Sequence, residues 1–195
     1  MVAEDFSHLL PSSQTLMRLN NEERIKYIRA DHWIGYTQAT TAIEKLHALL
    51  TYPERQRMPN LLIIGPTNNG KTMIIQKFLR LNPPQSSRNG THENIPVLSV
   101  QMPTMPDLKR FYNNLLYKLN VPELYNFTSL PKLETTVLRF LKVVRLKMLA
   151  TDEIHNILAG KNDQRHNFLN FLRFLGNELK IPLICVGIKD AYMAI

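Results

Sequence analysis

The sequence is short of the features that mark secreted and membrane proteins. It has one cysteine among 195 residues, so a disulfide framework within the chain is excluded. That residue, Cys185, stands in an apolar run and is typical of a buried, inert thiol in a reducing compartment. No apolar run approaches membrane-spanning length, and the N-terminus is acidic instead of apolar, which argues against a secretory signal. We therefore expect a cytoplasmic protein that does not contact a membrane.

The sequence also lacks histidine pairs at metal-binding spacing and has fewer acidic than basic residues. The six histidines show no pair at metal-binding spacing, which argues against a structural metal site. The 16 Asp and Glu residues are outnumbered by 24 Lys and Arg, for a formal net charge of +8. Such an excess favours contact with polyanions, nucleic acid being the usual one, although many basic proteins bind none. Neither a repeat period nor a low-complexity tract is present.

Apolar patterning predicts an N-terminal arm over residues 1–30, with one or two short helices, followed by one core over residues 31–195. Residues 31–36 are expected to form a loop. The predicted helices cover 37–50, 73–81, 107–119, 132–145 and 164–179. The predicted strands cover 60–64, 96–101, 148–150 and 182–186, and 82–94 is predicted to be a surface loop. Strands that alternate with helices of this length indicate an α/β fold, a parallel sheet with helices on both faces.

An eight-residue segment fits the phosphate-loop pattern G-x-x-x-x-G-K-[ST] in full. It consists of Gly65, Pro66, Thr67, Asn68, Asn69, Gly70, Lys71 and Thr72. The glycines permit the tight curvature that lets backbone N–H groups converge on phosphates. Lys71 is expected to reach the β and γ phosphates and Thr72 to ligate Mg²⁺, while the helix starting near Met73 points its N-terminal dipole at the anion. A strand before the loop and a helix after it support a P-loop NTPase that binds ATP with Mg²⁺.

The predicted strand over residues 148–150 runs into a pair of carboxylates, Asp152 and Glu153. An acid at the carboxyl end of a strand is expected to lie beside the phosphate loop of a neighbouring strand. Asp152 would hold Mg²⁺, through water, and Glu153 would orient or deprotonate the attacking water. Lys71 and Glu153 are thus the candidate catalytic residues. The spacing of the motifs, with Glu next to Asp, favours the additional-strand division of P-loop ATPases.

Together with His155, the acidic pair also spells a DExH box. Helicases with that motif need two recombinase-like lobes, and a chain of this length supplies only one. His155 is therefore expected to be a capping or packing residue, not a metal ligand.

Several separate blocks resemble the TniB family of transposition ATP-binding proteins. They are residues 29–36, 57–65, 68–72, 152–160, 168–179 and 181–183. The resemblance extends from about Arg29 to the end of the chain and, through the family, to TnsC and MuB. It implies a bacterial AAA+ ATPase of a mobile element. Such a protein would self-associate into an ATP-dependent ring or filament on duplex DNA and connect a target site to a transposase and target-selection proteins.

The resemblance also implies residue roles. Trp33, Ile34 and Tyr36 would lie near the adenine, although plain core packing is an equal alternative for Trp33 and Tyr36. A second group, Lys109, Arg110 and Lys118, would face DNA, or else form a solvated helix face. No aromatic-basic interleaving suggests base stacking, so DNA contacts should be to phosphates and tolerant of sequence.

Two departures from the family pattern matter. Ile188 stands where the family's polar Thr is expected, which weakens a γ-phosphate sensor there. The chain stops at Ile195, before the fifth strand, arginine finger and helical lid of an AAA+ module, so we expect a piece of a longer protein. Two alternatives stay open: a nucleotide-gated scaffold with little turnover, and an AAA+ loader for another DNA machine.

Overall fold

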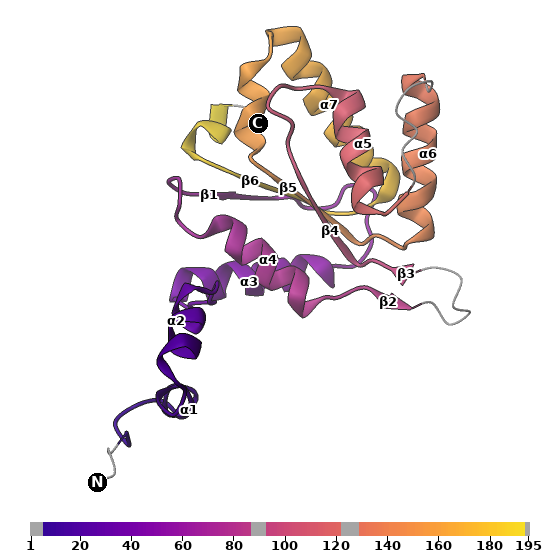
Figure 1. The fold of residues 1–195 in the computed structure, drawn as a ribbon. Helices are drawn as coiled ribbons and strands as arrows, with labels where there is room; N and C mark the ends of the chain where they lie inside the picture. The colour runs from indigo at the N-terminus through magenta and orange to yellow at the C-terminus, as the bar shows by residue number, and fades with distance from the viewer. Residues whose placement is uncertain (1–5, 87–92, 122–128, 194–195) are drawn as a thin grey trace. The chain divides into compact units, whose positions relative to one another are not determined.

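The computed structural model describes residues 6–86, 93–121 and 129–193, which form two compact units, Met1–Ile34 and Gly35–Ile195 (Figure 1). The first unit holds helices α1 (Pro11–Met17) and α2 (Asn21–Arg29). α2 begins with a capping box, in which the Asn20 side chain accepts from the Glu23 amide and Glu23 accepts from the Asn20 amide. Across the described residues, no helix combines the length and apolar character needed to cross a bilayer.

The second unit is built on a parallel four-stranded sheet. Its strands are β1 (Leu61–Ile64), β4 (Val97–Gln101), β5 (Met148–Asp152) and β6 (Leu183–Gly187), in the spatial order β1-β6-β5-β4. The predicted strands and the additional-strand arrangement are confirmed, since β6 lies between the strand before the phosphate loop and the strand that ends in Asp152. One detail of the prediction is wrong: β5 is not the neighbour of β1. Strand order depends on tertiary packing, which local patterning does not encode.

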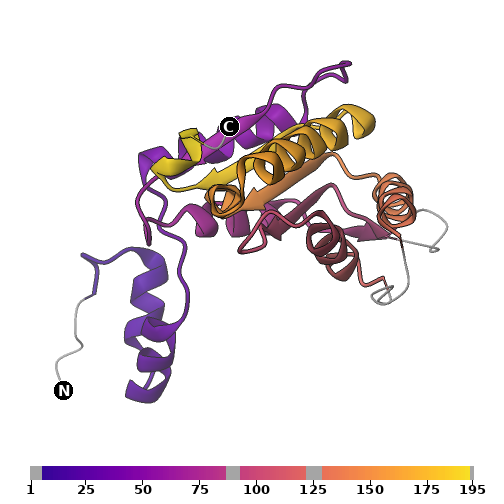
Figure 2. The same ribbon diagram turned by 90° about the horizontal axis from the view of Figure 1, so that it is seen from above.

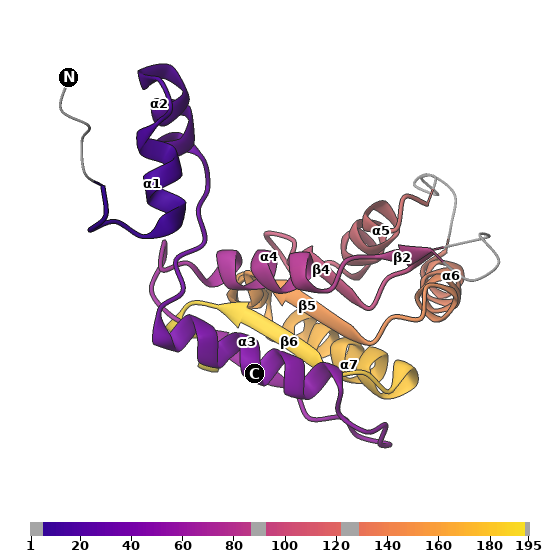
Figure 3. The ribbon, with the colours of Figure 1, turned by 90° about the horizontal axis from the view of Figure 1, so that it is seen from below.

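Helices cover both faces of the sheet, as predicted (Figures 2 and 3). α3 (Thr37–Leu50) and α4 (Lys71–Leu81) cover one face. The other face carries α5 (Leu108–Lys118), α6 (Leu130–Val143) and α7 (Asn162–Leu179). Two short 3₁₀ helices, η1 (Ile154–Ala159) and η2 (Lys189–Met193), follow β5 and β6. The predicted helices are all present, and their ends shift by only a few residues, the usual uncertainty of boundaries.

The segment 82–94 is not wholly a loop, contrary to prediction. β2 (Gln85–Ser86) and β3 (Glu93–Asn94) pair antiparallel, with Gln85 opposite Asn94 and Ser86 opposite Glu93. Strands of two residues are too short to show the period-2 alternation by which a strand is recognised in sequence.

The alternation of side chains along β5 directs its residues to two separate cores. Leu149 belongs to the larger core, formed with α5, α6 and α7. Met148, Ala150 and Asp152 lie on the opposite face, because residues two apart point the same way. The carboxylate of Asp152 contacts Thr72 of α4, so this face of β5 is the one that α4 covers. The same alternation that builds the core therefore delivers Asp152 to the start of α4.

Four aromatic rings lock the larger core. Phe111 and Tyr112 of α5 meet Phe168 and Phe171 of α7, with ring centroids 4.9 to 5.6 Å apart in edge-to-face geometry. The hydroxyl of Tyr112 donates to Glu134 of α6 at 2.6 Å. The pKa of Tyr112 is raised mainly by burial and to a smaller extent by this hydrogen bond. The rings thereby fasten α5 and α7 to each other and α5 to α6.

We predict that Phe111→Ala lowers the free energy of unfolding by about 3–5 kcal/mol, because the side chain is fully buried and its removal leaves a cavity among rings that cannot collapse. Urea denaturation measures the change. Phe174→Ala on α7 is the matched control, since Phe174 is 42% exposed, and it should cost less than about 1 kcal/mol. Equal losses in the two variants would contradict the assigned core.

Candidate nucleotide-binding site

The predicted phosphate loop connects β1 to α4. Two of its residues have left-handed backbone conformations, Asn68 with φ 57° and Gly70 with φ 74°. Glycine and asparagine tolerate this region better than other residues, which explains why they stand there. The amide of Gly65 donates to the carbonyl oxygen of Gly187 at 3.3 Å, so the loop begins where it is attached to the end of β6. These features give the compact turn before a helix N-terminus that binds anions.

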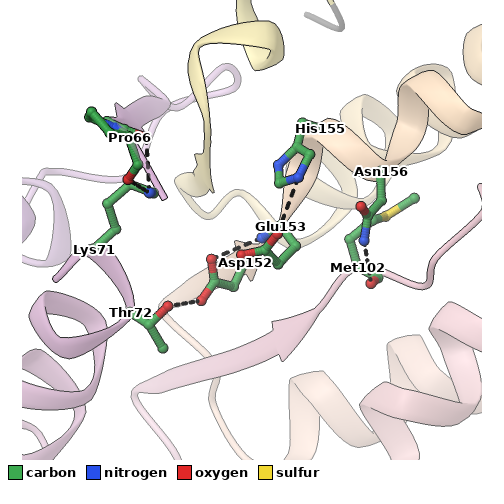
Figure 4. Close-up of polar contacts among 9 residues, drawn as sticks. Pro66, Lys71, Thr72, Met102, Asp152, Glu153, His155 and Asn156 are labelled. Carbon is green, nitrogen blue, oxygen red and sulfur yellow. Dashed lines mark hydrogen bonds and ion pairs between the residues drawn. The ribbon is translucent and has the colours of Figure 1, made fainter. Parts of the chain in front are cut away.

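Lys71 is the first residue of α4, and its side chain folds back over the loop (Figure 4). Its ammonium donates to the carbonyl oxygens of Gly65 at 3.0 Å and Pro66 at 2.7 Å, and the residue is only 9% exposed. Backbone carbonyl groups accept two of the three donors of the ammonium without neutralising its charge. The positive charge and the N-terminus of α4 therefore act together on an anion placed in the loop.

Thr72 and Asp152 meet although 80 residues separate them in sequence. The hydroxyl of Thr72 donates to Asp152 Oδ2 at 2.7 Å, and the amide of Glu153 donates to Oδ1 at 2.8 Å (Figure 4). β5 brings Asp152 to this position from two strands away, past β6.

A hydroxyl and a carboxylate are hard oxygen donors of the kind that Mg²⁺ prefers. No group of three or more His, Cys, Asp and Glu side chains arranged for a metal occurs in the described part of the chain. The residues present thus fit an ion held by Thr72 and Asp152 with water and phosphate oxygens as its other ligands, the usual division for Mg²⁺ in nucleotide sites. They do not fit an ion enclosed by protein ligands alone.

Glu153 has φ 57°, a conformation that a glutamate adopts only at some energetic cost. Its Oε2 lies 3.2 Å from Nε2 of His155. Sequence reasoning missed this contact, because His155 was assigned to capping or packing. The DExH spacing alone did not indicate the contact, because position 155 returns to position 153 only through a left-handed residue and the 3₁₀ turn after it.

A polar cavity of about 350 Å³ adjoins these carboxylates. It is lined by Thr72, Asp152 and Glu153, and by Gln76, Ser99, Val100, Gln101, Asn114, Tyr117 and Lys118. Lys118 is therefore placed at this cavity, whereas Lys109 and Arg110 are exposed near the other end of α5. The three residues predicted to face DNA do not form one patch on the helix.

The remaining predicted site residues fall around the loop. Tyr36 directly precedes α3, and its hydroxyl would lie 3.7 Å from a Cβ built on Gly70. This places the ring beside the end of the phosphate loop. Trp33 and Ile34 belong to the first unit, so their adenine role stays a prediction. Thr67 and Asn69 are exposed in the loop, and Met73 is half-buried in the first turn of α4.

A family model described as "Bacterial TniB protein" matches residues 24–195. The chain belongs to the TniB family. The α/β fold predicted for it is shared by two solved structures. The Orc1 protein of Aeropyrum pernix in complex with DNA matches 84% of this chain with a TM-score of 0.59 and 17% identity. Cdc6p from Pyrobaculum aerophilum matches 84% with a TM-score of 0.56 and 16% identity.

This TniB-family chain spans about two fifths of each of those structures, 41% of Orc1 and 42% of Cdc6p. No curated protein matches it. At such identities the likeness establishes the fold, while the roles of individual side chains rest on the contacts described above.

We predict that Gly70→Ala destabilises this TniB-family protein by about 1–2 kcal/mol, because the Cβ of an alanine at φ 74° would lie too close to the following carbonyl oxygen. Gly65→Ala is the control: a Cβ there would meet the amide of Asn69, a movable side chain, at 3.2 Å. Urea unfolding of both variants without nucleotide measures the two costs. A Gly65→Ala loss as large as that of Gly70→Ala would contradict backbone strain as the cause.

Proposed function

We propose that this TniB-family protein binds and hydrolyses ATP with Mg²⁺ and uses the nucleotide to regulate DNA transposition. In this role it assembles on duplex DNA and links a target site to a transposase. The observation that carries the ATPase part is the contact between Thr72 and Asp152, which joins the phosphate loop to the acidic pair. Glu153 comes with Asp152, since the two are adjacent and hydrogen bonded.

In the proposed reaction the loop amides and the Lys71 ammonium bind the β and γ phosphates. Thr72 and Asp152 would hold Mg²⁺, which when bound neutralises charge on the phosphate oxygens. Glu153 orients a water molecule and accepts one of its protons as the water oxygen bonds to the γ-phosphorus. The bond from that phosphorus to the β–γ bridging oxygen breaks, leaving ADP and phosphate. The polar cavity beside Glu153 has room for this water.

We expect Glu153→Gln to lower the turnover number about 100-fold or more while ATP binding is retained, because the amide keeps the size of the side chain and loses its basicity. Lys71→Ala should instead lose ATP affinity. Phosphate release measures turnover, and a fluorescent ATP analogue measures binding. Undiminished hydrolysis by Glu153→Gln would exclude it as the base.

The DNA-binding part of the proposal is supported by the net charge of +8 and by exposed Lys109 and Arg110 at the start of α5. The Orc1 protein that shares the fold was solved in complex with DNA, which further supports it. Basic side chains on an exposed helix face bind phosphates without reading bases, so affinity should fall steeply with salt.

The DNA prediction is that wild-type protein with ATP binds an arbitrary labelled duplex in fluorescence anisotropy, and that Lys71→Ala abolishes the ATP dependence. The double variant Lys109→Ala/Arg110→Ala should bind more weakly, with a salt slope smaller by about 2. Lys132→Ala/Lys147→Ala removes the same charge from exposed positions elsewhere and should change the slope little. An equal effect of the two double variants would mean that net charge, not this helix end, binds DNA.

A nucleotide-gated scaffold with little turnover is the second candidate function. It is favoured by Ile188, an apolar, half-buried residue directly after β6, where a polar group would contact the γ phosphate in the family pattern. ATP binding without hydrolysis in the wild type would support the scaffold. An AAA+ loader for another DNA machine would differ from both in its protein partner.

A further inference from the structure

Glu153 has a partner that the proposed reaction does not use. Its Oε2 lies 3.2 Å from Nε2 of His155, and Figure 4 shows the ring directed at the carboxylate. The two side chains meet because Glu153 is left-handed and η1 begins directly after it. A strained residue of this kind persists only where its surroundings hold it. The contact with His155 is one such restraint on the side chain.

The other ring nitrogen of His155 defines the tautomer. Nδ1 is buried and has no hydrogen-bond partner among the described residues. It lies on the side of β6, 3.3 Å from the position of a Cβ built on Gly187. A buried N–H without an acceptor is costly, and a bare lone pair less so, so the proton belongs on Nε2. Nε2–H then donates to Oε2 of Glu153.

We infer that His155 is a positioning residue for Glu153, an inference that rests on the proposed ATPase function. The imidazole holds Oε2 by donating to it, and Oε1 is the oxygen left to accept the proton of the attacking water. The ring itself is held against Gly187, whose carbonyl oxygen anchors Gly65 at the start of the phosphate loop. His155 thus fixes the carboxylate relative to the same strand end that fixes the loop.

Substituting a positioning residue and substituting a packing residue are expected to have different effects on stability, ATP binding and turnover. Loss of packing would lower stability and affect ATP binding and turnover together. Loss of positioning would let the Glu153 carboxylate rotate, which lowers turnover and leaves ATP binding intact, because the hydrogen bonds of Lys71 and Thr72 go to Gly65, Pro66 and Asp152 and not to His155. Groups that orient a functional side chain typically contribute 10- to 100-fold to its activity.

The kinetic experiment compares three variants at position 155. His155→Ala should lower kcat about 10-fold or more, with KM and the affinity for a fluorescent ATP analogue within about 2-fold of the wild type. His155→Gln should recover much of kcat, since its amide nitrogen occupies the place of Nε2. His155→Asn carries the same amide at the place of Nδ1 and should not recover it. A kcat for His155→Ala equal to that of the wild type would overturn the inference, as would equal behaviour of Gln and Asn.

A second measurement does not need turnover. Two-bond ¹H–¹⁵N spectra of the histidine rings, with His155→Gln used for assignment, should show the Nε2–H tautomer for His155. Glu153→Ala should then shift its Nε2 signal while the other histidines stay unchanged. The Nδ1–H tautomer, or a signal indifferent to Glu153→Ala, would overturn the contact.

The two measurements separate the inference from the function on which it rests. A wild type no faster than Lys71→Ala would refute hydrolysis, and the spectra would still decide whether His155 holds Glu153. A hydrolysing wild type with unaltered His155→Ala kinetics would refute positioning alone.

Discussion

The hydrogen bond between Thr72 and Asp152 joins the two halves of the nucleotide-binding unit, and much of the architecture serves to make it possible. One partner follows the loop after β1, and the other ends β5, with β6 between the two strands. The hydroxyl of Thr72 and Oδ2 of Asp152 lie 2.7 Å apart although β6 separates the two strands, so α4 and β5 must both be placed accurately. α4 must lie on the face to which Asp152 points, and β5 must have the register that ends opposite Gln101 of β4. A slip of one residue in β5 would turn Asp152 to the face of α5 and α7 and bury a carboxylate in an apolar core.

The end of β6 is the second constraint, because it is packed from three sides. A Cβ built on Gly187 would lie 3.1 Å from Ile154, 3.2 Å from Ala191 and 3.3 Å from His155. These distances are shorter than ordinary van der Waals contact, so a side chain there would displace the segments that follow β5 and β6. The same residue accepts the hydrogen bond from Gly65. A glycine at this strand end therefore allows the phosphate loop and the turn after Glu153 to approach one strand together.

Local signals in the sequence predicted the helices and strands. They did not predict which strands are adjacent in the sheet or which side chains meet. α3 has the predicted bounds, since Ala39 and Leu46 recur at helical spacing and are fully buried. The phosphate loop was recognised because its chemistry demands glycine and lysine at fixed offsets. The motif spacing predicted the additional-strand class, but the expected adjacency of β5 and β1 was wrong, because hydrophobic strands carry no label of their position in a sheet. The contact of His155 with Glu153 was missed for a related reason, because it depends on a left-handed φ that glutamate rarely adopts.

The contacts of η1 connect the acidic pair to the helix that carries Lys109 and Arg110. The amide of Met102 donates to the carbonyl oxygen of Asp152 at 2.8 Å, and Asn156 donates to the carbonyl oxygen of Met102 at 3.4 Å. At the far end of η1, a Cβ on Gly160 would stand 2.2 Å from Pro106, so only a glycine permits this approach. The loop that leads into α5 is thus attached to the segment after Glu153 at both of its ends. Contiguity of this kind would let a shift of the Asp152 or Glu153 carboxylate reach the start of α5 through packed groups. Asp107 completes the path by capping α5 through the amide of Arg110, which makes the first turn of that helix part of the same rigid assembly.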